Sequence, residues 1–303
     1  MSAGRPVVDD VSVVVPTLGR DLLRGCLESI RAGSAWPAEL IVVDQSTNPE
    51  VAGWVDALTA DGMEVVHLHS DQRGIAAATN WGLERVGTPY AATTHDDCRA
   101  RKDWIGRLAA RVREVGDAIV TGRVEPEGEG LVLTVITRAE PAVYTEPLID
   151  GDVLFPANMG FPIRLLERIG YLDEHPSLNV AGEDNDWAHR ALRAGVPIMY
   201  EPGIVVGHLA WQDPSQRTAL YRRYARGQGS FYGKHLRRGD RFIARRVLRA
   251  LVRAPWLLFR GAATGNRELL AMGVGEVTGL LPGLVAGFGN RGDRVPRFPA
   301  SSG

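Results

Sequence analysis

The pair Asp96-Asp97 stands where an apolar strand that opens at Tyr90 runs out into a loop. Adjacent carboxylates repel one another, so a shared cation is one explanation of the pair, and a hard divalent metal is the first candidate. An Asx-type turn that ends the strand is the other explanation. The carboxyl edge of an open α/β sheet also borders the crevice in which ligands bind. The pair therefore predicts a metal site or a turn at a place suited to a ligand.

Asp44 closes an earlier apolar run, so in a parallel sheet it would share an edge with Asp96 and Asp97. Each acid alone could be a turn-former. Three carboxylates that converge on one crevice suit a nucleotide, because one can contact a base or ribose and another can hold a cation beside a diphosphate. Gly74 would allow close backbone approach at a helix start, where free amides favour anions, and Arg73 could add charge.

A second acidic cluster, Glu183-Asp184-Asn185-Asp186, begins directly after Gly182. Acids in this position suit the first turn of a helix. Three acids within four positions would otherwise repel one another unless one binds a proton or faces a cation, which is how a general base is tuned. His208 follows an apolar run and is either a structural histidine or a metal ligand beside the acid pair.

Apolar runs and helical patterns alternate from residue 11 to about residue 125. The pattern predicts strands at 11–15, 40–43, 65–68, 90–92 and 118–120, with helices at 21–31, 51–58, 75–86 and 104–115. Continuous apolar strands joined by crossovers of helical length indicate an α/β fold with a mostly parallel sheet flanked by helices.

The rhythm changes after Glu125, at a turn-rich acidic stretch that runs to Gly130. The segment 131–152 is expected to hold one strand and a loop. Two further helices are predicted at 163–169 and 184–193, and two short strands at 197–200 and 204–206.

The segment from Arg217 to Arg260 is rich in arginine and aromatic residues, and Asp240 is its only acid. Such a basic amphipathic region could lie on an anionic membrane, bind phosphates, or pack its apolar stripe on the rest of the chain. The following apolar stretch, 269–288, contains many glycines and Pro282, which argue against a membrane-spanning helix.

The 303 residues carry a formal net charge of -1, which gives no general argument for nucleic-acid binding. Cys26 and Cys98 make neither a disulfide framework nor a zinc set. Residues 1–10 lack a secretory signal, so a cytoplasmic protein is expected, and high Arg with low Lys is typical of a GC-rich bacterial genome. We expect an N-terminal tail (1–10), a catalytic domain (11–212, with halves 11–125 and 126–212), a basic helical region (213–290) and a flexible tail (291–303).

The order of several modest motifs resembles the inverting family 2 glycosyltransferases of the GT-A fold, over roughly Val11 to His208. The motifs are Val13-Val14-Val15-Pro16-Thr17, Val42-Val43-Asp44-Gln45-Ser46, Gly74 with Asn80, His95-Asp96-Asp97, Asn158-Met159-Gly160, Gly182 to Trp187 with Arg190, and Gly207-His208.

The resemblance implies a role for each matching residue. Contacts to the nucleotide-sugar donor would come from Pro16, Thr17, Arg20, Asp44, Arg73, Gly74, Asn80, His95 and Asp96. Asp97 and His208 would ligate Mg²⁺ or Mn²⁺. Asp184 would be the catalytic base with Glu183 beside it, and Asn158 and Trp187 would contact the acceptor.

The implied reaction is inverting hexosyl transfer from a UDP- or dTDP-sugar to the hydroxyl of a saccharide, a lipid-linked or a natural-product acceptor. Three departures from the family pattern concern donor preference: the acid pair lacks the Asp-x-Asp spacing, Gln45 replaces an acid, and Arg73 replaces an Asn. A nucleotidyltransferase, a non-catalytic nucleotide-sugar sensor and a membrane scaffold remain alternatives. A dehydrogenase is poorly supported, because the turn after Pro16 lacks G-x-G-x-x-G. The tail predicts peripheral contact with an anionic membrane, at the inner face of the cell membrane; the oligomeric state is not predicted.

Overall fold

The computed structural model describes residues 5–148, 154–178 and 181–290. In this part of the chain nine strands form one sheet in the order β3-β2-β1-β4-β8-β6-β9-β5, with β7 paired to β9. The strands are β1 (Val7–Thr17), β2 (Trp36–Asp44), β3 (Val65–His69), β4 (Tyr90–Thr93), β5 (Cys98–Ala100), β6 (Ile119–Glu127), β7 (Ala142–Tyr144), β8 (Met159–Pro162) and β9 (Ile198–Leu209). The α/β fold with a central sheet flanked by helices, which the sequence predicts, is confirmed.

The first half of the sheet is parallel, as its apolar runs predict. β1 pairs in parallel with β2 and β4, and β2 with β3. The joining helices are α1 (Leu22–Arg31), α2 (Glu50–Ala60), α3 (Ile75–Arg85) and α4 (Trp104–Val115). Thr17 lies opposite Asp44, and Asp44 opposite His69, so the carboxyl ends of three strands meet at one edge. This is the edge at which the acid pair leaves β4.

The second half of the sheet is mixed. β8 runs antiparallel to both β4 and β6, whereas β6 and β9 are parallel. The two short strands expected at 197–200 and 204–206 are one strand, β9, whose pairing with β6 shifts register between Gly122 and Arg123. Pro202 and Gly203 lie in this irregularity, and Pro has no N–H to donate to a ladder, so the strand bulges there and continues.

Two boundaries in the first half of the chain differ slightly from the expected ones. β1 begins at Val7, four residues before the expected start, because Val7 and Val8 pair with Trp36 and Pro37. β6 continues through the expected turn to Glu127, and the chain turns at Gly128, whose φ of 89° favours glycine. The expected flexible tail, 291–303, lies outside the described residues.

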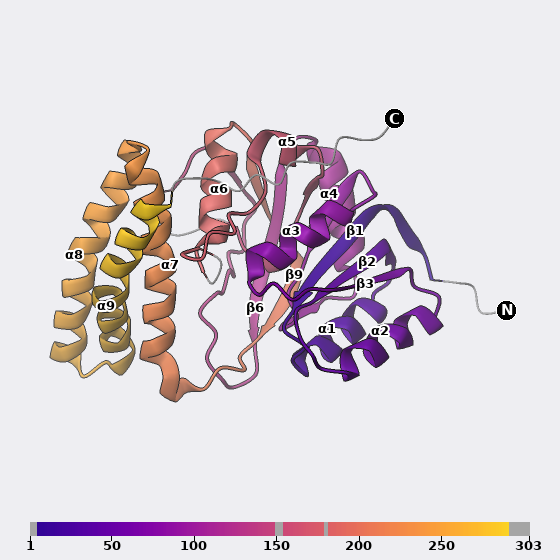
Figure 1. Ribbon diagram of the computed structural model, residues 1–303, viewed down its shortest axis with the longest axis horizontal. Helices are drawn as coiled ribbons and strands as arrows, with labels where there is room; N and C mark the ends of the chain where they lie inside the picture. Colours follow the sequence, from indigo (N-terminus) through magenta and orange to yellow (C-terminus); the bar gives the residue numbers. More distant parts are fainter. Residues whose placement is uncertain (1–4, 149–153, 179–180, 291–303) are drawn as a thin grey trace.

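Two short helical turns and two helices lie between the sheet strands and the basic region: η1 (Pro156–Asn158), α5 (Leu165–Ile169), α6 (Glu183–Arg193) and η2 (Pro214–Gln216). The basic region then forms three long helices, α7 (Arg217–Arg237), α8 (Arg241–Thr264) and α9 (Arg267–Gly289). They stand together at one end of the molecule, and α6 lies between them and the sheet (Figure 1).

The contact between α7 and α9 is made through glycine. Gly275, Gly279, Gly283 and Gly287 recur every four residues on α9 and meet the backbone of α7. A Cβ at Gly283 would lie 2.0 Å from the carbonyl oxygen of Arg226. Small residues at this spacing let two helix backbones approach closely, so the glycines that argued against a spanning helix are the packing surface of α9.

α8 and α9 also expose apolar side chains. Along α8 these are Leu248, Val252, Trp256 and Phe259, each 49–75% exposed, at helical spacing on one face. Among the described residues one helix, α9, meets the length and composition of a membrane span, and 33% of its apolar window is buried.

Candidate active site at the carboxyl edge of the sheet

Asp97 and His208 lie side by side because β5 follows the acid pair directly and pairs with β9. Cys98 is opposite His208 in this ladder, and Asp97 accepts a main-chain hydrogen bond from Leu209. His208 Nε2 is 3.7 Å from Asp97 Oδ2. The indole of Trp211 donates to the same oxygen at 3.0 Å. Residues that are 111 positions apart in the sequence therefore form one polar cluster.

The tautomer of His208 is set by its second nitrogen. Nδ1 lies 3.1 Å from the carbonyl oxygen of Thr134, which can only accept, so Nδ1 carries a proton. Nε2 faces Asp97, as a donor to its carboxylate when protonated or as a ligand when a cation takes the place of that proton. Burial by itself would raise the pKa of Asp97, but the hydrogen bond and charge of His208, with His95 and Trp211, outweigh it and lower that pKa. The Asp97 carboxylate is therefore ionised at neutral pH.

The ligand atoms of Asp97, Cys98 and His208 all lie within 4.8 Å of one another. A carboxylate with an imidazole lone pair fits a divalent cation, and the mixed oxygen and nitrogen set suits Mn²⁺ better than Mg²⁺. Burial, followed by the charge of Asp97, raises the pKa of Cys98, so its thiol stays protonated and is a poor ligand. Asp97 and His208 are the pair that fits the implied metal.

His95 lies near this pair but is not free to move. Its ring is edge-on to Phe155, with centroids 5.6 Å apart, and Phe155 also contacts the ring of His208. Burial lowers the pKa of His95 although Asp97 and Asp96 act in the opposite direction, so the ring is neutral. A neutral imidazole beside the acid pair is a hydrogen-bonding group and not a cation.

Asp96 is buried and binds the loop after β1. Thr17 Oγ1 donates to Asp96 Oδ2 at 2.8 Å, and Arg20 forms an ion pair with the same carboxylate. Arg20 also lies 3.7 Å from Asp97, and its guanidinium carbon is 4.5 Å from the ring centre of Trp211. Asp96 therefore positions the side chains of Thr17 and Arg20 and is itself buried.

Asp44, at the end of β2, accepts from the backbone of Ser46 at 2.8 Å and lies 3.5 Å from His67 Nε2. Gln45, next to it, accepts from the backbone N–H of Gly74 at 2.6 Å. The φ of Gly74 is 138°, a value that suits glycine, at the start of α3. Gln45 thus ties the end of β2 to the start of α3. Arg73 is exposed beside this contact, and Pro16 is buried at the end of β1.

Glu183 and Asp184 begin α6 directly after Gly182, whose φ of 94° favours glycine. Glu183 is buried and Asp184 is half-buried. Burial, together with the adjacent Asp184 carboxylate, raises the pKa of Glu183 well above its usual range. The acidic cluster therefore keeps its proton on Glu183 and leaves Asp184 as the accessible carboxylate.

The start of α6 is fixed by α7. A Cβ at Gly182 would lie 2.6 Å from the carbonyl oxygen of Gly227, and a Cβ at Gly227 would lie 2.2 Å from that of Ala181. Asn185 Nδ2 also donates to Gln228 Oε1 at 2.6 Å. The two carboxylates at the head of α6 are thus held against the C-terminal helices as well as against the sheet.

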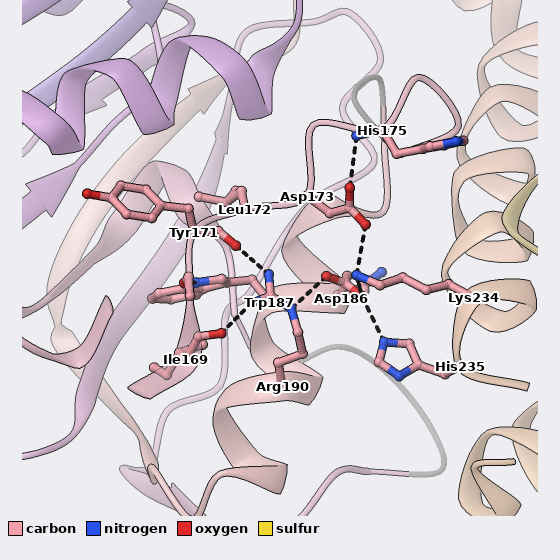
Figure 2. Close-up of polar contacts among 12 residues, drawn as sticks. Ile169, Tyr171, Leu172, Asp173, His175, Asp186, Trp187, Arg190, Lys234 and His235 are labelled. Carbon is pink, nitrogen blue, oxygen red and sulfur yellow. Dashed lines mark hydrogen bonds and ion pairs between the residues drawn. The ribbon is translucent and has the colours of Figure 1, made fainter. Parts of the chain in front are cut away.

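One turn further along α6, a buried ionic network joins the same two helices (Figure 2). Lys234 Nζ on α7 lies 2.8 Å from Asp173 and 2.7 Å from Asp186, and none of the three side chains is exposed. Asp186 also accepts from Arg190 at 2.8 Å and contacts His235 at 2.7 Å. Burial alone would raise the pKa of Asp186, but Arg190, Lys234 and His235 outweigh it and hold it well below its usual range.

A cavity of about 660 Å³ connects the Asp97–His208 pair to the head of α6. One wall holds Asp97, His95 and His208, and the head of α6 contributes Glu183 and Asp184. A further wall is formed by α7, α8 and α9, and its side chains include Tyr224, Gln228 and Arg249. The basic helical region, expected as a unit apart from 11–212, is thus part of the same cavity.

Three residues that were predicted to contact the donor or the acceptor have buried side chains. Asn80 is 1% exposed and is held by the backbone of Leu172 and by Glu174. Asn158 is fully buried and binds Trp104 and the carbonyl oxygens of Arg123 and Ile204. Trp187 is 1% exposed and donates to Gly170. Each lies where the family motif has it and its polar groups bind other parts of the chain, so direct contact with donor or acceptor stays a prediction.

Sequence reasoning missed Trp211, Tyr224 and Lys234. Trp211 is 44% exposed three residues after His208, a position at which an aromatic side chain near a site could have been noticed. Tyr224 and Lys234 stand in the arginine-rich segment; Lys234 is its one lysine, a difference that sequence reasoning did not use. Their roles depend on where α7 packs.

The chain is similar to known proteins in sequence and in fold. Residues 12–157 match the sequence profile of the family described as Glycosyl transferase family 2. A curated relative, the pre-mycofactocin glycosyltransferase of Mycobacterium tuberculosis, is 28% identical over 233 residues, which cover 74% of this chain and 46% of that protein. The chain thus matches less than half the length of that relative.

Among solved structures, the mannosyltransferase PcManGT from Pyrobaculum calidifontis, in complex with GDP-Man and Mn²⁺, has a TM-score of 0.60 at 15% identity, over 92% of this chain and 87% of that one. S. aureus TarS in complex with UDP-GlcNAc has a TM-score of 0.55 at 16% identity, over 73% and 66%. At such identities the likeness concerns the fold. The profile match shows that residues 12–157 are similar to glycosyltransferase family 2, and the likeness to the solved structures shows the GT-A fold.

Proposed function

We propose that this chain is an inverting, metal-dependent glycosyltransferase that moves a sugar from a UDP- or dTDP-sugar to an acceptor hydroxyl. The observation that carries the proposal is the shared cavity, in which the Asp97–His208 pair and the half-buried Asp184 line one space. A cation site for the leaving diphosphate and a carboxylate for the acceptor proton are the two groups that such a displacement needs.

The donor would lie along the carboxyl edge of the sheet. We assign nucleotide contacts to Pro16, Thr17, Asp44, Arg73 and Gly74, all near the ends of β1 and β2 or the start of α3. Arg20, held by Asp96, and the neutral His95 would contact the diphosphate or sugar. The relatives solved with UDP-GlcNAc and GDP-Man support a nucleotide-sugar donor of this general kind.

Asp97 and His208 would hold Mn²⁺ or Mg²⁺. When bound, the cation neutralises negative charge that develops on the departing diphosphate. Arg20, 3.7 Å from Asp97, would add a cationic side chain at the same end of the cavity. Trp211 covers Arg20 and donates to Asp97, so it would limit water at this end.

Asp184 would be the base. The acceptor oxygen forms a bond to the anomeric carbon as the bond from that carbon to the diphosphate breaks, and the hydroxyl proton passes to the Asp184 carboxylate. A single displacement inverts the anomeric configuration. Glu183, which keeps its proton because of burial and the neighbouring charge, cannot compete for this role.

The deciding experiment replaces Asp184 by Asn and follows donor hydrolysis and transfer with UDP- and dTDP-sugars in Mn²⁺. We expect the D184N variant to fold and to bind donor but to lose turnover by about a hundredfold or more. Asp56→Asn, an exposed acid on α2, is the matched control and should retain activity. Near-normal turnover by D184N would exclude Asp184 as the base. If the wild-type protein binds donor but shows no turnover with any divalent metal, the sensor alternative is favoured.

We also propose peripheral contact with an anionic membrane at the inner face of the cell membrane, and the charge of the helical region supports this proposal. Residues 217–290 carry 14 Lys and Arg against three Asp and Glu, whereas the rest of the chain carries 21 against 33. The exposed apolar stripe of α8 lies in this cationic part. A positively charged surface with exposed apolar side chains suits anionic lipid.

A further inference from the structure

A second cluster of potential metal ligands lies where α6, α7 and α8 meet. It consists of His189 of α6, His235 of α7 and Asp240, which is the N-terminal cap of α8. A ligand atom from each of these three side chains lies within 4.8 Å of the other two. The three residues do not line the cavity described above, so the cluster is separate from the Asp97–His208 pair.

The ring of His235 is oriented by a carboxylate. Its Nε2 lies 2.7 Å from Oδ1 of Asp186, whose carboxylate also pairs with Arg190 and Lys234 (Figure 2). Because that carboxylate is ionised and can only accept, Nε2 carries a proton, and in the neutral ring Nδ1 is left with the lone pair. A carboxylate that fixes a histidine in this way is the usual outer partner of a histidine that binds a metal through its other nitrogen.

His189 faces Asp240 and is not bound on its other side. Its Nε2 lies 2.9 Å from Asp240 Oδ2, and Nδ1 of the same ring is buried without a hydrogen-bond partner among the described residues. Because Nδ1 is not committed to another group, it can carry the ring proton when a cation takes the place of the Nε2 proton. The ring then stays neutral and shares the cation with Asp240.

Asp240 is positioned by its own helix. Its Oδ1 accepts from the backbone N–H groups of Phe242 and Ile243 at 2.8 and 3.2 Å, as the cap of a helix does. Arg193 of α6 donates to Oδ1 at 2.9 Å and to Oδ2 at 3.2 Å. Arg193 is exposed, so it can remain on Oδ1 when a cation takes its place beside Oδ2.

Aromatic packing holds the two imidazoles in place. The ring centroids of His189 and His235 are 4.6 Å apart, and Phe231 is edge-on to both, at 5.5 and 5.2 Å. Phe242 stacks on His189 at 6.1 Å. Rings that are fixed in the folded chain need little further ordering when a metal binds, so the cluster is preorganised.

We propose that His189, His235 and Asp240 form a second metal site, which binds Zn²⁺ or a similar transition metal and joins α6, α7 and α8. Two imidazoles and one carboxylate are a ligand set that suits Zn²⁺, with a fourth position left for water. Because the ligands come from three helices, the metal would stabilise the docking of α7 and α8 on α6. The proposal is independent of the proposed function, and it stands whether or not Asp97 and His208 bind a metal.

The test uses Co²⁺, which absorbs visible light strongly in a four- or five-coordinate site and weakly when six waters surround it. Every protein in the series carries Asp97→Asn, so that the proposed catalytic cation site is weakened. We expect the D97N protein to bind about one equivalent of Co²⁺ with strong visible absorption, which Zn²⁺ abolishes by displacement. Zn²⁺ should also raise the melting temperature of this protein.

Two variants remove ligands with little change to the fold. His189→Gln keeps an amide that can donate to Asp240, and it should weaken Co²⁺ binding by about tenfold or more. Asp240→Asn should act similarly while it keeps the cap of α8, because Asn also caps a helix, and it keeps the test valid if H189Q does not fold. His69→Gln, an exposed histidine on β3, is the matched control and should leave the affinity unchanged.

Two results would overturn the proposal. One is weak absorption in the D97N protein, which means that Co²⁺ stays hydrated, including the case in which the wild-type protein absorbs strongly and D97N alone abolishes the absorption. The other is equal affinity for Co²⁺ in H189Q and H69Q. The absorption and the melting temperature require neither donor nor turnover, so an inactive protein would still report on the site.

Discussion

Lys234 of α7 lies 2.7 Å from Asp186 of α6, and both side chains are completely buried. Asp186 is one turn after Glu183 on the same helix. One of the cations that offset Asp186, beside Arg190 of α6 itself, is thus supplied by the C-terminal region. The stability of the helical bundle and the placement of Asp184 are therefore coupled.

Removal of that cation should be costly. Lys234→Met leaves Asp173 and Asp186 short of a partner in a buried setting, and loss of one member of such a pair typically costs about 3–5 kcal/mol of unfolding free energy. Urea denaturation gives the value. Arg241→Gln, an exposed basic residue at the start of α8, should change it by less than about 0.5 kcal/mol. Equal effects of the two variants would show that the network adds nothing beyond surface charge.

The contribution of Glu183 to the free energy of unfolding should fall as the pH rises. Its folded pKa lies above the unfolded value, so protonated Glu183 stabilises the fold at pH below the unfolded pKa of about 4.5, and this contribution is lost as the pH rises toward the folded pKa. Glu183→Gln stays neutral at every pH. The unfolding free energy of E183Q relative to wild type should therefore increase with pH above about 4.5. Urea titrations between pH 4.5 and pH 8 measure the difference, and a difference that does not change with pH would contradict a raised pKa.

Metal binding should depend on Asp97 and His208. His208→Ala and Asp97→Asn should each weaken Mn²⁺ binding by about tenfold or more, as followed by the electron paramagnetic resonance signal of free Mn²⁺. Cys98→Ala is the neighbouring control. Because the Cys98 thiol keeps its proton, the variant should bind Mn²⁺ with unchanged affinity. A stronger effect from Cys98 than from His208 would point to a softer metal.

The glycine contact between α7 and α9 can be tested by adding a side chain. Gly283→Val places a Cβ 2.0 Å from the Arg226 carbonyl oxygen, so the helices must separate, and overpacking of this kind typically costs about 1–3 kcal/mol. Gly289→Ala adds a Cβ on the same helix with nothing within 4 Å, and it should be nearly neutral. Thermal unfolding monitored by circular dichroism compares the two. A neutral G283V would mean that α9 does not dock on α7 in solution.

The exposed stripe of α8 should determine affinity for vesicles. Trp256→Ser with Phe259→Ser removes two exposed aromatic side chains and should lower sedimentation with anionic vesicles several-fold, with binding that weakens as salt is raised. Val143→Ser changes an exposed apolar residue on β7, away from α8, and should have no effect. Binding to neutral vesicles that equals binding to anionic ones would argue against a role for the arginines.

Sequence periodicity predicted the edge at which the candidate site lies, because apolar runs that end at Asp44 and before Asp96 and are joined by helices indicate parallel strands with a common carboxyl edge. It could not show which polar groups the chain itself uses. Asn80, Asn158 and Trp187 fit the family motif by position, yet their amide and indole groups bind backbone carbonyls brought close by folding. Such use depends on distances across the sheet, which local pattern does not contain.

The C-terminal helices illustrate the same limit. Their basic and apolar pattern predicted helices and left three uses of the arginines open. Lys234 is the one lysine among the arginines of 217–290, but its role depends on its partners Asp173 and Asp186, 61 and 48 positions earlier in the chain. Glycine at every fourth position of α9 was visible in the sequence, but the partner backbone was not.

The close backbone contact at Gly182 and Gly227 sets a rule for engineering acceptor specificity in this protein. A chimera that joins a relative's C-terminal helices after residue 212 would place a foreign surface against the native turn before Glu183, and any residue larger than glycine at position 227 would push that turn away. Exchange of α6 together with α7 to α9 keeps this contact within one parent. The functional crossover point therefore lies upstream of α6, inside what sequence comparison would treat as the catalytic domain.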